Sequence, residues 1–256
     1  MGKLSEMKMN ILKILPLLIF LLIWEFIISS IGNNTFLFSK PSSIFVALIE
    51  NLKNLQLVYD FLITGYETIM GFVVGNAIGI ILGFSLWYSE LIAKISKPYI
   101  IAIGAIPIFA IAPMTIMWFG TGAFAKIMMA TLSTFTIALS QSYLGSQNVD
   151  INQINLLKTF GASKFTIFRK IIIPSSLIWV FSSLKLNIGF ALLGAFIGEF
   201  ISSEEGLGYR ILKSSSLYDT SLLLASLICL VSLAFLLNFI VGMFEKKFVR
   251  YIQKTN

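Results

Sequence analysis

The sequence contains no histidine and a single cysteine, Cys229. The absence of histidine excludes imidazole-based catalytic triads, histidine metal ligands and histidine proton shuttles. One cysteine cannot form an internal disulfide or a cysteine metal cluster, so we expect no metal site in this chain. Charged residues are also scarce, at 12% of the chain, whereas soluble globular domains carry about 25%.

Long hydrophobic runs take the place of charge. Hydrophobic residues make up 57% of the 256 residues, and the mean hydropathy is +0.90. A transmembrane helix needs about 20 mostly apolar residues. The sequence therefore predicts an all-α polytopic membrane protein of about six transmembrane helices, with residues 1–256 forming one transmembrane domain. The predicted spans are 11–31, 61–87, 98–119, 123–142, 178–201 and 221–244.

The net charge of +7 is explained better by membrane topology than by nucleic acid, so lipid is the expected surrounding and no nucleic acid partner is expected. With the N-terminus inside, thirteen of the 19 lysines and arginines fall on the inside and four on the outside, while Lys126 and Lys185 lie within spans. Lysine and arginine collect on the cytoplasmic side. This bias places both termini and the 143–177 loop in the cytoplasm.

Three spans carry side-chain patterns with two interpretations each. The second has glycines four residues apart, which permit close helix packing or line a pore. The third, with Pro107 and Pro113, is expected to be broken or kinked, either beside a translocation path or as a packing kink. The fourth carries hydroxyls that bond their own helix or line the pathway. The glycines are Gly71, Gly75, Gly79 and Gly83, and the hydroxyls are Thr131, Ser133, Thr136 and Ser140.

The polar stretch 143–177 separates the fourth and fifth spans. Its only acid is Asp150, against the four basic residues Lys158, Lys164, Arg169 and Lys170. Apolar residues three apart over 151–160 predict a helix, and Gly161 can end that helix with a left-handed turn.

A second helix is predicted directly after this turn. Ser163 is a good N-cap for it. Phe165, Phe168 and Ile172 are expected on one of its faces, and Pro174 is expected to end or kink it. From composition alone, a solvated loop with two surface helices explains the stretch equally well.

The chain lacks the residues of a nucleotide site or an enzyme. There is no G-x-x-x-x-G-K-[ST] loop, and the GTGAFAK segment at 120–126 has the wrong spacing. If the protein uses ATP, another chain binds it. Membrane carboxylates are candidates for function, but Glu67 and Glu199 lie near the outer ends of their spans, which favours hydrated or helix-end roles; Glu25 lies deepest. We find no paired carboxylates and no nucleophile with a base, so no catalytic residue is expected.

The polar stretch resembles the EAA loop of permease subunits of bacterial and archaeal ABC importers. That pattern reads E-A-A, three residues, Gly, nine residues and I-x-L-P. Gly161, the nine residues 162–170 and the run Ile171–Pro174 match its spacing, and the Gly-Ala-Ser-Lys core at 161–164 agrees with it. The opening triplet departs from it, since Asn-Leu-Leu at 155–157 replaces Glu-Ala-Ala.

Further short motifs, in order over about residues 15–250, are similar to those of nitrate/sulfonate/taurine-type permeases and of thiamine-precursor importers. They are Trp24-Glu25, Lys40-Pro41-Ser42, Trp118-Phe119-Gly120 and Gly206-Leu207-Gly208-Tyr209. The resemblance implies the type I ABC importer permease fold in a cytoplasmic (inner) membrane.

The resemblance also implies a set of partners. Two permease copies, expected here as a homodimer, would form the pathway for a small solute. ABC ATPase subunits holding ATP and Mg would bind the cytoplasmic loops, and an extracytoplasmic substrate-binding protein would deliver the solute. The second loop helix would dock in a cleft of the ATPase. The residues so assigned to coupling are Lys158, Gly161, Ala162, Ser163, Lys164, Phe165, Phe168, Arg169 and Pro174.

Two other classes of function stay open. One is an ion-coupled secondary transporter that uses the membrane carboxylates Glu25, Glu67 or Glu199. Its usual sequence sign is a pair of interrupted spans in matching positions of two halves, whereas only one Pro-broken span and no clear repeat occur here. The other is a membrane structural protein, which leaves the basic helix–turn–helix unexplained.

Overall fold

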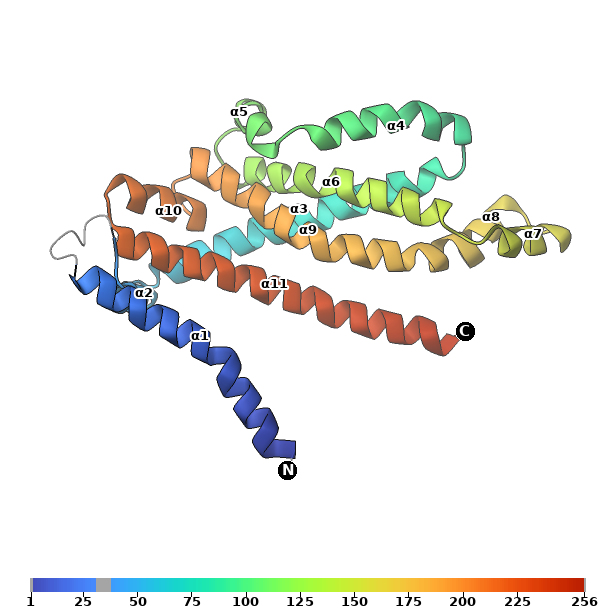
Figure 1. The fold of residues 1–256 in the computed structure, drawn as a ribbon. Coiled ribbons are helices and arrows are strands. Elements are labelled where there is room, and N and C mark those ends of the chain that lie inside the picture. The colour runs from blue at the N-terminus through green and yellow to red at the C-terminus, as the bar shows by residue number, and fades with distance from the viewer. Residues whose placement is uncertain (1, 31–37, 256) are drawn as a thin grey trace.

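The computed structural model describes residues 2–30 and 38–255. This part of the chain is entirely helical and has no strand, which confirms the predicted all-α class. The longest helices run along one common direction, with short helices at both ends (Figure 1). The helices are α1 (Gly2–Ser30), α2 (Pro41–Lys53), α3 (Gln56–Leu86), α4 (Glu90–Ala105), α5 (Ile108–Phe119), α6 (Ala123–Gln147), α7 (Ile151–Thr159), α8 (Lys164–Ile167), α9 (Ile173–Ser202), α10 (Leu207–Ser216) and α11 (Thr220–Thr255).

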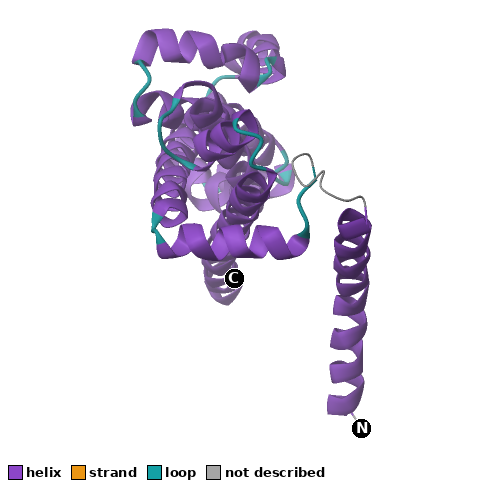
Figure 2. Cartoon of the chain, turned by 90° about the vertical axis from the view of Figure 1, so that its left-hand side faces the viewer, coloured by secondary structure: helices purple, strands orange, loops and turns teal. Residues whose placement is uncertain are grey.

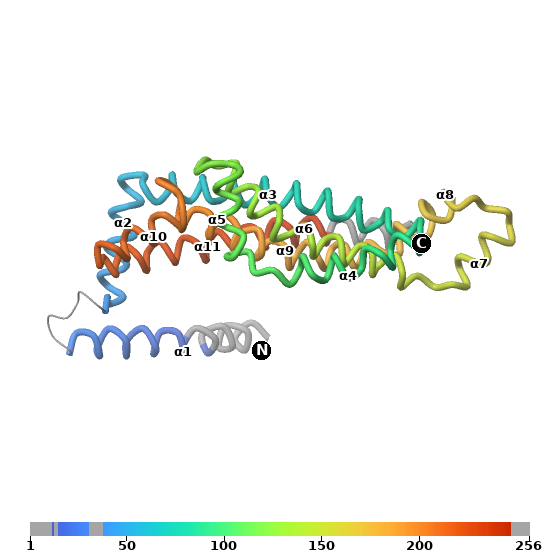
Figure 3. Tube along the Cα trace, turned by 90° about the horizontal axis from the view of Figure 1, so that it is seen from above, coloured from blue at the N-terminus to red at the C-terminus, as the bar shows by residue number. Residues whose placement is uncertain are grey.

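Helices α3, α6 and α9 pack together as the centre of the bundle, and α11 lies against α9 and α3. Helices α2 and α10 gather at one end, here called the α10 end, while α7 and α8 project from the opposite end, the loop end (Figure 3). Midway between the ends, the amide Nδ2 of Asn187 donates to Oδ1 of Asn76 at 2.6 Å and to the carbonyl of Thr134 at 3.2 Å. This buried bridge ties the three central helices to one another.

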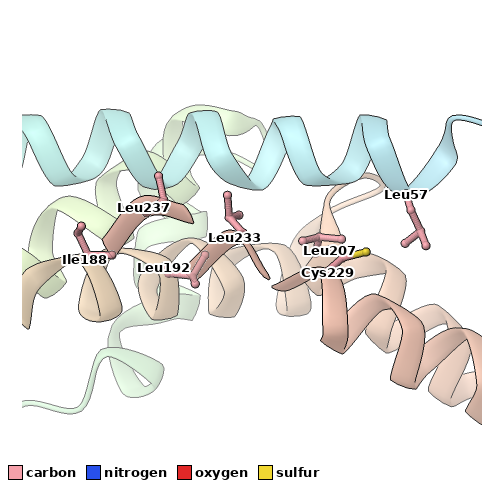
Figure 4. Packing of buried hydrophobic residues seen from close by; sticks show 7 residues of the cluster. All are labelled: Leu57, Ile188, Leu192, Leu207, Cys229, Leu233 and Leu237. Atoms are coloured by element: carbon pink, nitrogen blue, oxygen red, sulfur yellow. The ribbon is translucent and has the colours of Figure 1, made fainter. Parts of the chain in front are cut away.

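The main apolar core lies where α3, α9, α10 and α11 meet. Its side chains point into the space between these helices (Figure 4). They are Leu57, Ile188, Leu192, Leu207, Cys229, Leu233 and Leu237. Cys229, only 8% exposed, therefore behaves as a small apolar core residue.

The contact between α3 and α6 depends on the four glycines of α3. All four are buried against α6. A Cβ at Gly75 would lie 2.6 Å from the carbonyl oxygen of Thr131, and one at Gly79 would lie 2.6 Å from that of Phe135. Such separations are too short for any side chain, so the glycines let the two backbones approach. This face of α3 is a helix-packing surface rather than the wall of a pore.

The predicted break in the third span is present. Helices α4 and α5 meet at an angle of 92°, with Pro107 between them. Helix α4 begins at Glu90, earlier than the predicted start at 98, because Ser89 caps it by accepting a hydrogen bond from the Ile92 amide. Hydropathy does not detect this first part of α4, since it contains Glu90 and Lys94.

Pro174 was expected to end or kink the second loop helix, and it does not end it. Residues Lys164–Ser202 form one continuous helix of 39 residues. A π turn, Phe168–Ile172, precedes the proline. Pro174 has no backbone N–H, and its ring would crowd the preceding turn of an α-helix. The wider π turn accommodates both features. Since α6 also extends to Gln147, the irregular part of the predicted 143–177 loop shrinks to 148–150 and 160–163, on either side of α7.

Helix α1 packs against α2 and stands apart from the bundle (Figure 2). Among the described residues, four helices are long and apolar enough to cross a membrane, or five if α4 and α5 count as one span. The first predicted span corresponds to the shorter apolar segment Leu15–Ser30 of α1. Residue 31 lies outside the described residues, as do the side chains of Lys3, Lys8, Lys13, Arg250 and Lys254.

Candidate functional site

The predicted helix–turn–helix is present at the loop end. The Asp150 carboxylate caps α7 by accepting a hydrogen bond from the Asn152 amide at 2.9 Å. Gly161 then takes a left-handed conformation with φ +72. The Ser163 hydroxyl caps α8 by accepting from the Thr166 amide at 3.2 Å. Local capping chemistry therefore sets the shape of this turn.

The turn is fastened to the connection between α3 and α4. The Lys164 ammonium donates to the carbonyl of Tyr88 at 2.5 Å and lies 5.5 Å from the ring centre of Trp87. The Phe168 ring lies 4.8 Å from that of Tyr88, 5.5 Å from that of Trp87 and 6.0 Å from that of Phe84. We call this set of contacts the loop-end joint.

The expectation that Phe165, Phe168 and Ile172 share one face is wrong. Phe165 is 63% exposed, Phe168 is half-buried in the loop-end joint, and Ile172 is fully buried. The π turn Phe168–Ile172 alters the rotation per residue between Phe168 and Ile172, so the α-helical spacing does not apply to these two residues. Of the other predicted residues, Ala162 is half-buried in the turn and Pro174 is exposed beyond it.

The outward side of the turn combines apolar and cationic side chains, and we call it the loop-end surface. Leu156, Phe160 and Phe165 are 59%, 78% and 63% exposed. The exposed cations beside them are Lys158, Arg169 and Lys170. Sequence reasoning missed Phe160, although an aromatic residue next to a turn glycine was an available signal. A surface of this kind suits insertion into an apolar groove with an acidic rim.

Two of the four hydroxyl residues predicted as candidates for pathway lining pack between helices. Thr131 is 5% exposed and lies against the glycine face of α3. Ser133 bonds the carbonyl of Met129 at 2.8 Å, and a Cβ at Gly194 of α9 would lie 2.6 Å from its hydroxyl. The contacts of both residues in this chain are therefore packing contacts or bonds within their own helix. The half-buried residues Thr136 and Ser140 stay candidates for pathway lining.

At the α10 end, the first backbone N–H groups of α10 donate to side chains of α3 and α9. The three bonds run from Gly206 to Oδ1 of Asp60 (2.9 Å), from Leu207 to Oγ1 of Thr64 (2.9 Å) and from Gly208 to Oε2 of Glu199 (2.7 Å). Asp60 also pairs with Arg210 at 2.6 Å. A helix N-terminus leaves N–H groups unpaired and favours negative charge, so the two carboxylates hold α10 against the bundle.

The glycines of the Gly-Leu-Gly motif make room for Glu199. Gly206 has φ +96, and a Cβ there would lie 2.7 Å from Oε2 of Glu199. A Cβ at Gly208 would lie 2.8 Å from Cβ of Glu199. The motif is thus required by the approach of a buried carboxyl group to the backbone.

Glu67 and Glu199 were expected to have hydrated or helix-end roles; neither is hydrated, and Glu199 has a helix-end role at the start of α10. Glu67 is 2% exposed and Glu199 is 0% exposed, and their carboxyl groups lie close enough to each other for a hydrogen bond if one of them is protonated. A paired carboxylate site therefore exists, contrary to the sequence analysis. The partners lie far apart in sequence, so no local spacing could reveal the pair. Glu25, by contrast, caps α2 by accepting hydrogen bonds from the amide (3.0 Å) and hydroxyl (2.8 Å) of Ser42.

A recess of about 520 Å³ opens beside the carboxyl pair. Lys126 of α6, 2% exposed, lies in its wall and donates to the carbonyls of Thr121 and Ser202. The recess is lined by Glu67, Thr121, Gly122, Ala123, Lys126, Ser202, Ser203, Glu204 and Glu205. No group of three or more histidine, cysteine or acidic side chains that could hold a metal ion occurs among the residues searched in the described chain.

These features define a multi-pass helical membrane protein that offers a docking surface at one end and a buried polar cluster at the other. Residues 75–250 match the family described as "Binding-protein-dependent transport system inner membrane component". This match covers more than half of the chain. The chain belongs to this family and is a permease subunit of an ABC importer.

Curated relatives cover most of this chain. A probable ABC transporter permease protein of Haemophilus influenzae is 30% identical over 95% of this chain and 99% of its own length. The formylaminopyrimidine transport permease protein ThiX of Halalkalibacterium halodurans is 28% identical, over 80% of this chain and 82% of its own. The putative aliphatic sulfonates transport permease protein SsuC of Bacillus subtilis is 23% identical, over 82% and 76%. These relatives agree with the sulfonate and thiamine-precursor branch.

A solved structure shares the fold. A chain from an inward-facing crystal form of the MetNI methionine ABC transporter superposes with a TM-score of 0.66 at 19% identity. The match covers 77% of this chain and 96% of that chain. At this identity the likeness supports the fold alone, and it confirms an importer permease architecture.

Proposed function

We propose that this chain forms the translocation pathway for a small solute and is driven by ATP hydrolysis in a separate ATPase docked on the loop-end surface. The observation that carries the proposal is the loop-end joint. Lys164 and Phe168 fasten the turn to Trp87 and Tyr88, and α8 continues directly into α9. A rigid-body shift of a docked partner would therefore move α3, α4 and α9 together.

The same proposal includes the partners and the orientation of the chain. ATP and Mg are bound by the ATPase, and this chain itself is not catalytic. A second copy of the chain completes the pathway, and a binding protein delivers the solute at the α10 end. The protein lies in the cytoplasmic (inner) membrane, and both termini and the loop-end surface face the cytoplasm. The family and the excess of positive charge at the loop end support these assignments.

The solute is proposed to be a small sulfonate, nitrate or taurine-like anion, or a thiamine-precursor-like heterocycle. The names of two relatives support both groups, since one concerns formylaminopyrimidine and the other concerns aliphatic sulfonates. Fixed charges are few along the central helices, so we expect the binding protein to contribute much of the selectivity.

The test is co-purification of the tagged chain with the ATPase encoded beside it, followed by an ATPase and uptake assay in liposomes. Phe165→Asp and Gly161→Pro are expected to abolish ATP-coupled uptake and to leave membrane insertion intact. The first change places a carboxylate where an apolar side chain docks, and the second removes the left-handed turn. A matched control is Leu217→Asp, 67% exposed at the α10 end, which is expected to retain ATPase recovery.

Two results would overturn the proposal. One is normal ATP-coupled uptake by both loop variants. The other is a chain that purifies alone and catalyses ion-driven uptake in liposomes, which would favour a secondary transporter that uses Glu67 and Glu199.

A further inference from the structure

The carboxyl pair lies where three helices meet at the α10 end. Glu67 comes from α3 and Glu199 from α9, and Glu199 also accepts the Gly208 N–H at the start of α10. Both side chains are almost fully removed from solvent, at 2% and 0% exposure. Oε2 of Glu67 and Oε1 of Glu199 accept no hydrogen bond from an N–H or O–H group of the described chain. The side-chain hydrogen-bonding neighbours of the Glu199 carboxyl group are the Thr64 hydroxyl of α3 and the Glu67 carboxyl group.

A hydrogen bond between two carboxyl groups requires a proton. An ionised carboxylate is an acceptor only, and a protonated carboxyl group donates one O–H. Two ionised carboxylates in contact would repel each other in a medium that screens charge poorly, and pairs of this kind share one proton. A hydrogen bond between Glu67 and Glu199 would therefore need one proton shared by the two groups.

The surrounding charges balance when this proton is present. Lys126, on α6, is the cation that acts on the pair. Two carboxylates and one ammonium group would leave a buried net charge of minus one, whereas one shared proton makes the three groups neutral together. Isolated buried charge is costly. The neutral state is the one that this burial favours.

The remaining charged groups near the pair have partners of their own. Asp60 of α3 is paired with Arg210 of α10 at 2.6 Å. Glu205, between α9 and α10, accepts from the hydroxyl of Tyr59 at 2.9 Å. Helix α5 carries no titratable residue, and α11 brings the Cys229 thiol to this end of the core. None of these groups supplies a second buried cation to the pair.

We propose that Glu67 and Glu199 form a single-proton binding site that ties α3, α9 and α10 together at this end of the permease. The proton exchanges with the adjoining solution through the recess, since Glu67 lines it. Separation of α3 from α9 breaks the contact and releases the proton. A lower pH on this side therefore favours the closed arrangement, and a higher pH favours separation. The proposal concerns the permease itself and is independent of the solute and of the ATPase.

The first readout is infrared spectroscopy of the purified full chain in lipid nanodiscs. The wild-type protein is expected to show the C=O stretch of a buried protonated carboxylic acid at neutral pH. Glu67→Gln and Glu199→Gln are each expected to remove this band, because the glutamine amide donates the hydrogen bond in place of the proton. Glu204→Gln, at the exposed rim of the recess, is the matched control and is expected to retain the band.

The second readout is the pH dependence of thermal stability. The folded state binds one proton more than the unfolded chain near neutral pH, so stability falls as pH rises, by about tenfold in the unfolding constant per pH unit. Since the chain has no histidine, imidazole gives no background in this range. Glu67→Gln is expected to flatten the slope while Glu204→Gln keeps it.

Two outcomes overturn the site. One is the absence of a carboxylic acid band at neutral pH in the wild-type protein. The other is an unchanged pH slope in folded Glu67→Gln and Glu199→Gln. Neither measurement uses transport, so failure of this site and failure of the proposed import function are distinguishable.

Discussion

At the scale of single residues, Gly206 combines a left-handed backbone with a close approach to a buried carboxyl group. Its φ of +96 is unfavourable for any residue with a Cβ, and a Cβ would lie 2.7 Å from Oε2 of Glu199. We expect Gly206→Ala to destabilise the protein by roughly 1–3 kcal/mol, because backbone strain and displacement of the carboxylate act together. Thermal melting of the detergent-solubilised protein measures this loss.

Gly189 provides the control for this substitution. It lies in the middle of α9, and a Cβ there would meet nothing within 4 Å. Gly189→Ala is expected to be neutral or to stabilise by up to about 1 kcal/mol, since alanine is the better helix former. Equal melting temperatures for the two alanine variants would contradict the steric account of Gly206.

Single residues also show how far the sequence alone could lead. The left-handed Gly161 and the Ser163 cap follow from local rules and were predicted. The contact between Glu67 and Glu199 was not, because it is created by two helices that lie far apart in sequence. Near the end of a span, an acidic residue is equally compatible with water and with a buried partner. Only the packing of α3 on α9 decides between them.

At the scale of elements, the loop-end joint connects α8 to the turn between α3 and α4. Phe168→Ala removes the ring that contacts Trp87 and Tyr88. We expect the free energy of unfolding to fall by roughly 1–3 kcal/mol when this half-buried aromatic side chain is removed. The change should appear as faster amide hydrogen exchange over α7 and α8, with the central helices unchanged.

Phe160 is a matched aromatic residue on the same turn, but it is 78% exposed. Phe160→Ala is therefore expected to leave hydrogen exchange over α7 and α8 unaltered. If both variants exchange alike, the turn is held by its own capping bonds and the aromatic contacts contribute little.

Elements differ in how well their sequence predicts them. The glycine spacing on α3 indicated a close helix contact, and Pro107 indicated the break between α4 and α5. Pro174 misled, because a π turn allows the helix to continue through it. Hydropathy also placed the C-terminal end of α6 too early, at 142 instead of Gln147, and the start of α9 too late, at 178 instead of Ile173. Helical hydrogen bonding continues into polar residues after the apolar span has ended.

For the whole molecule, the proposed function assigns different partners to the two ends of the bundle, which requires that they face opposite sides of the membrane. Residue 155 on α7 and residue 204 at the rim of the recess are both exposed, at the loop end and the α10 end respectively. The single native cysteine, Cys229, is buried at 8% exposure, so Cys229→Ala gives a suitable background. Cysteines placed at the two positions can then be labelled separately with a membrane-impermeant maleimide.

We expect Glu204→Cys to react in intact cells and Asn155→Cys to react only after the membrane is permeabilised. The physical reason is the excess of lysine and arginine near the loop end, which retains that end in the cytoplasm. Labelling of both variants after permeabilisation serves as the control for accessibility. The reverse pattern would place the loop-end surface outside the cell, where no ATP-driven partner could reach it, and would overturn the coupling role proposed for this end of the molecule.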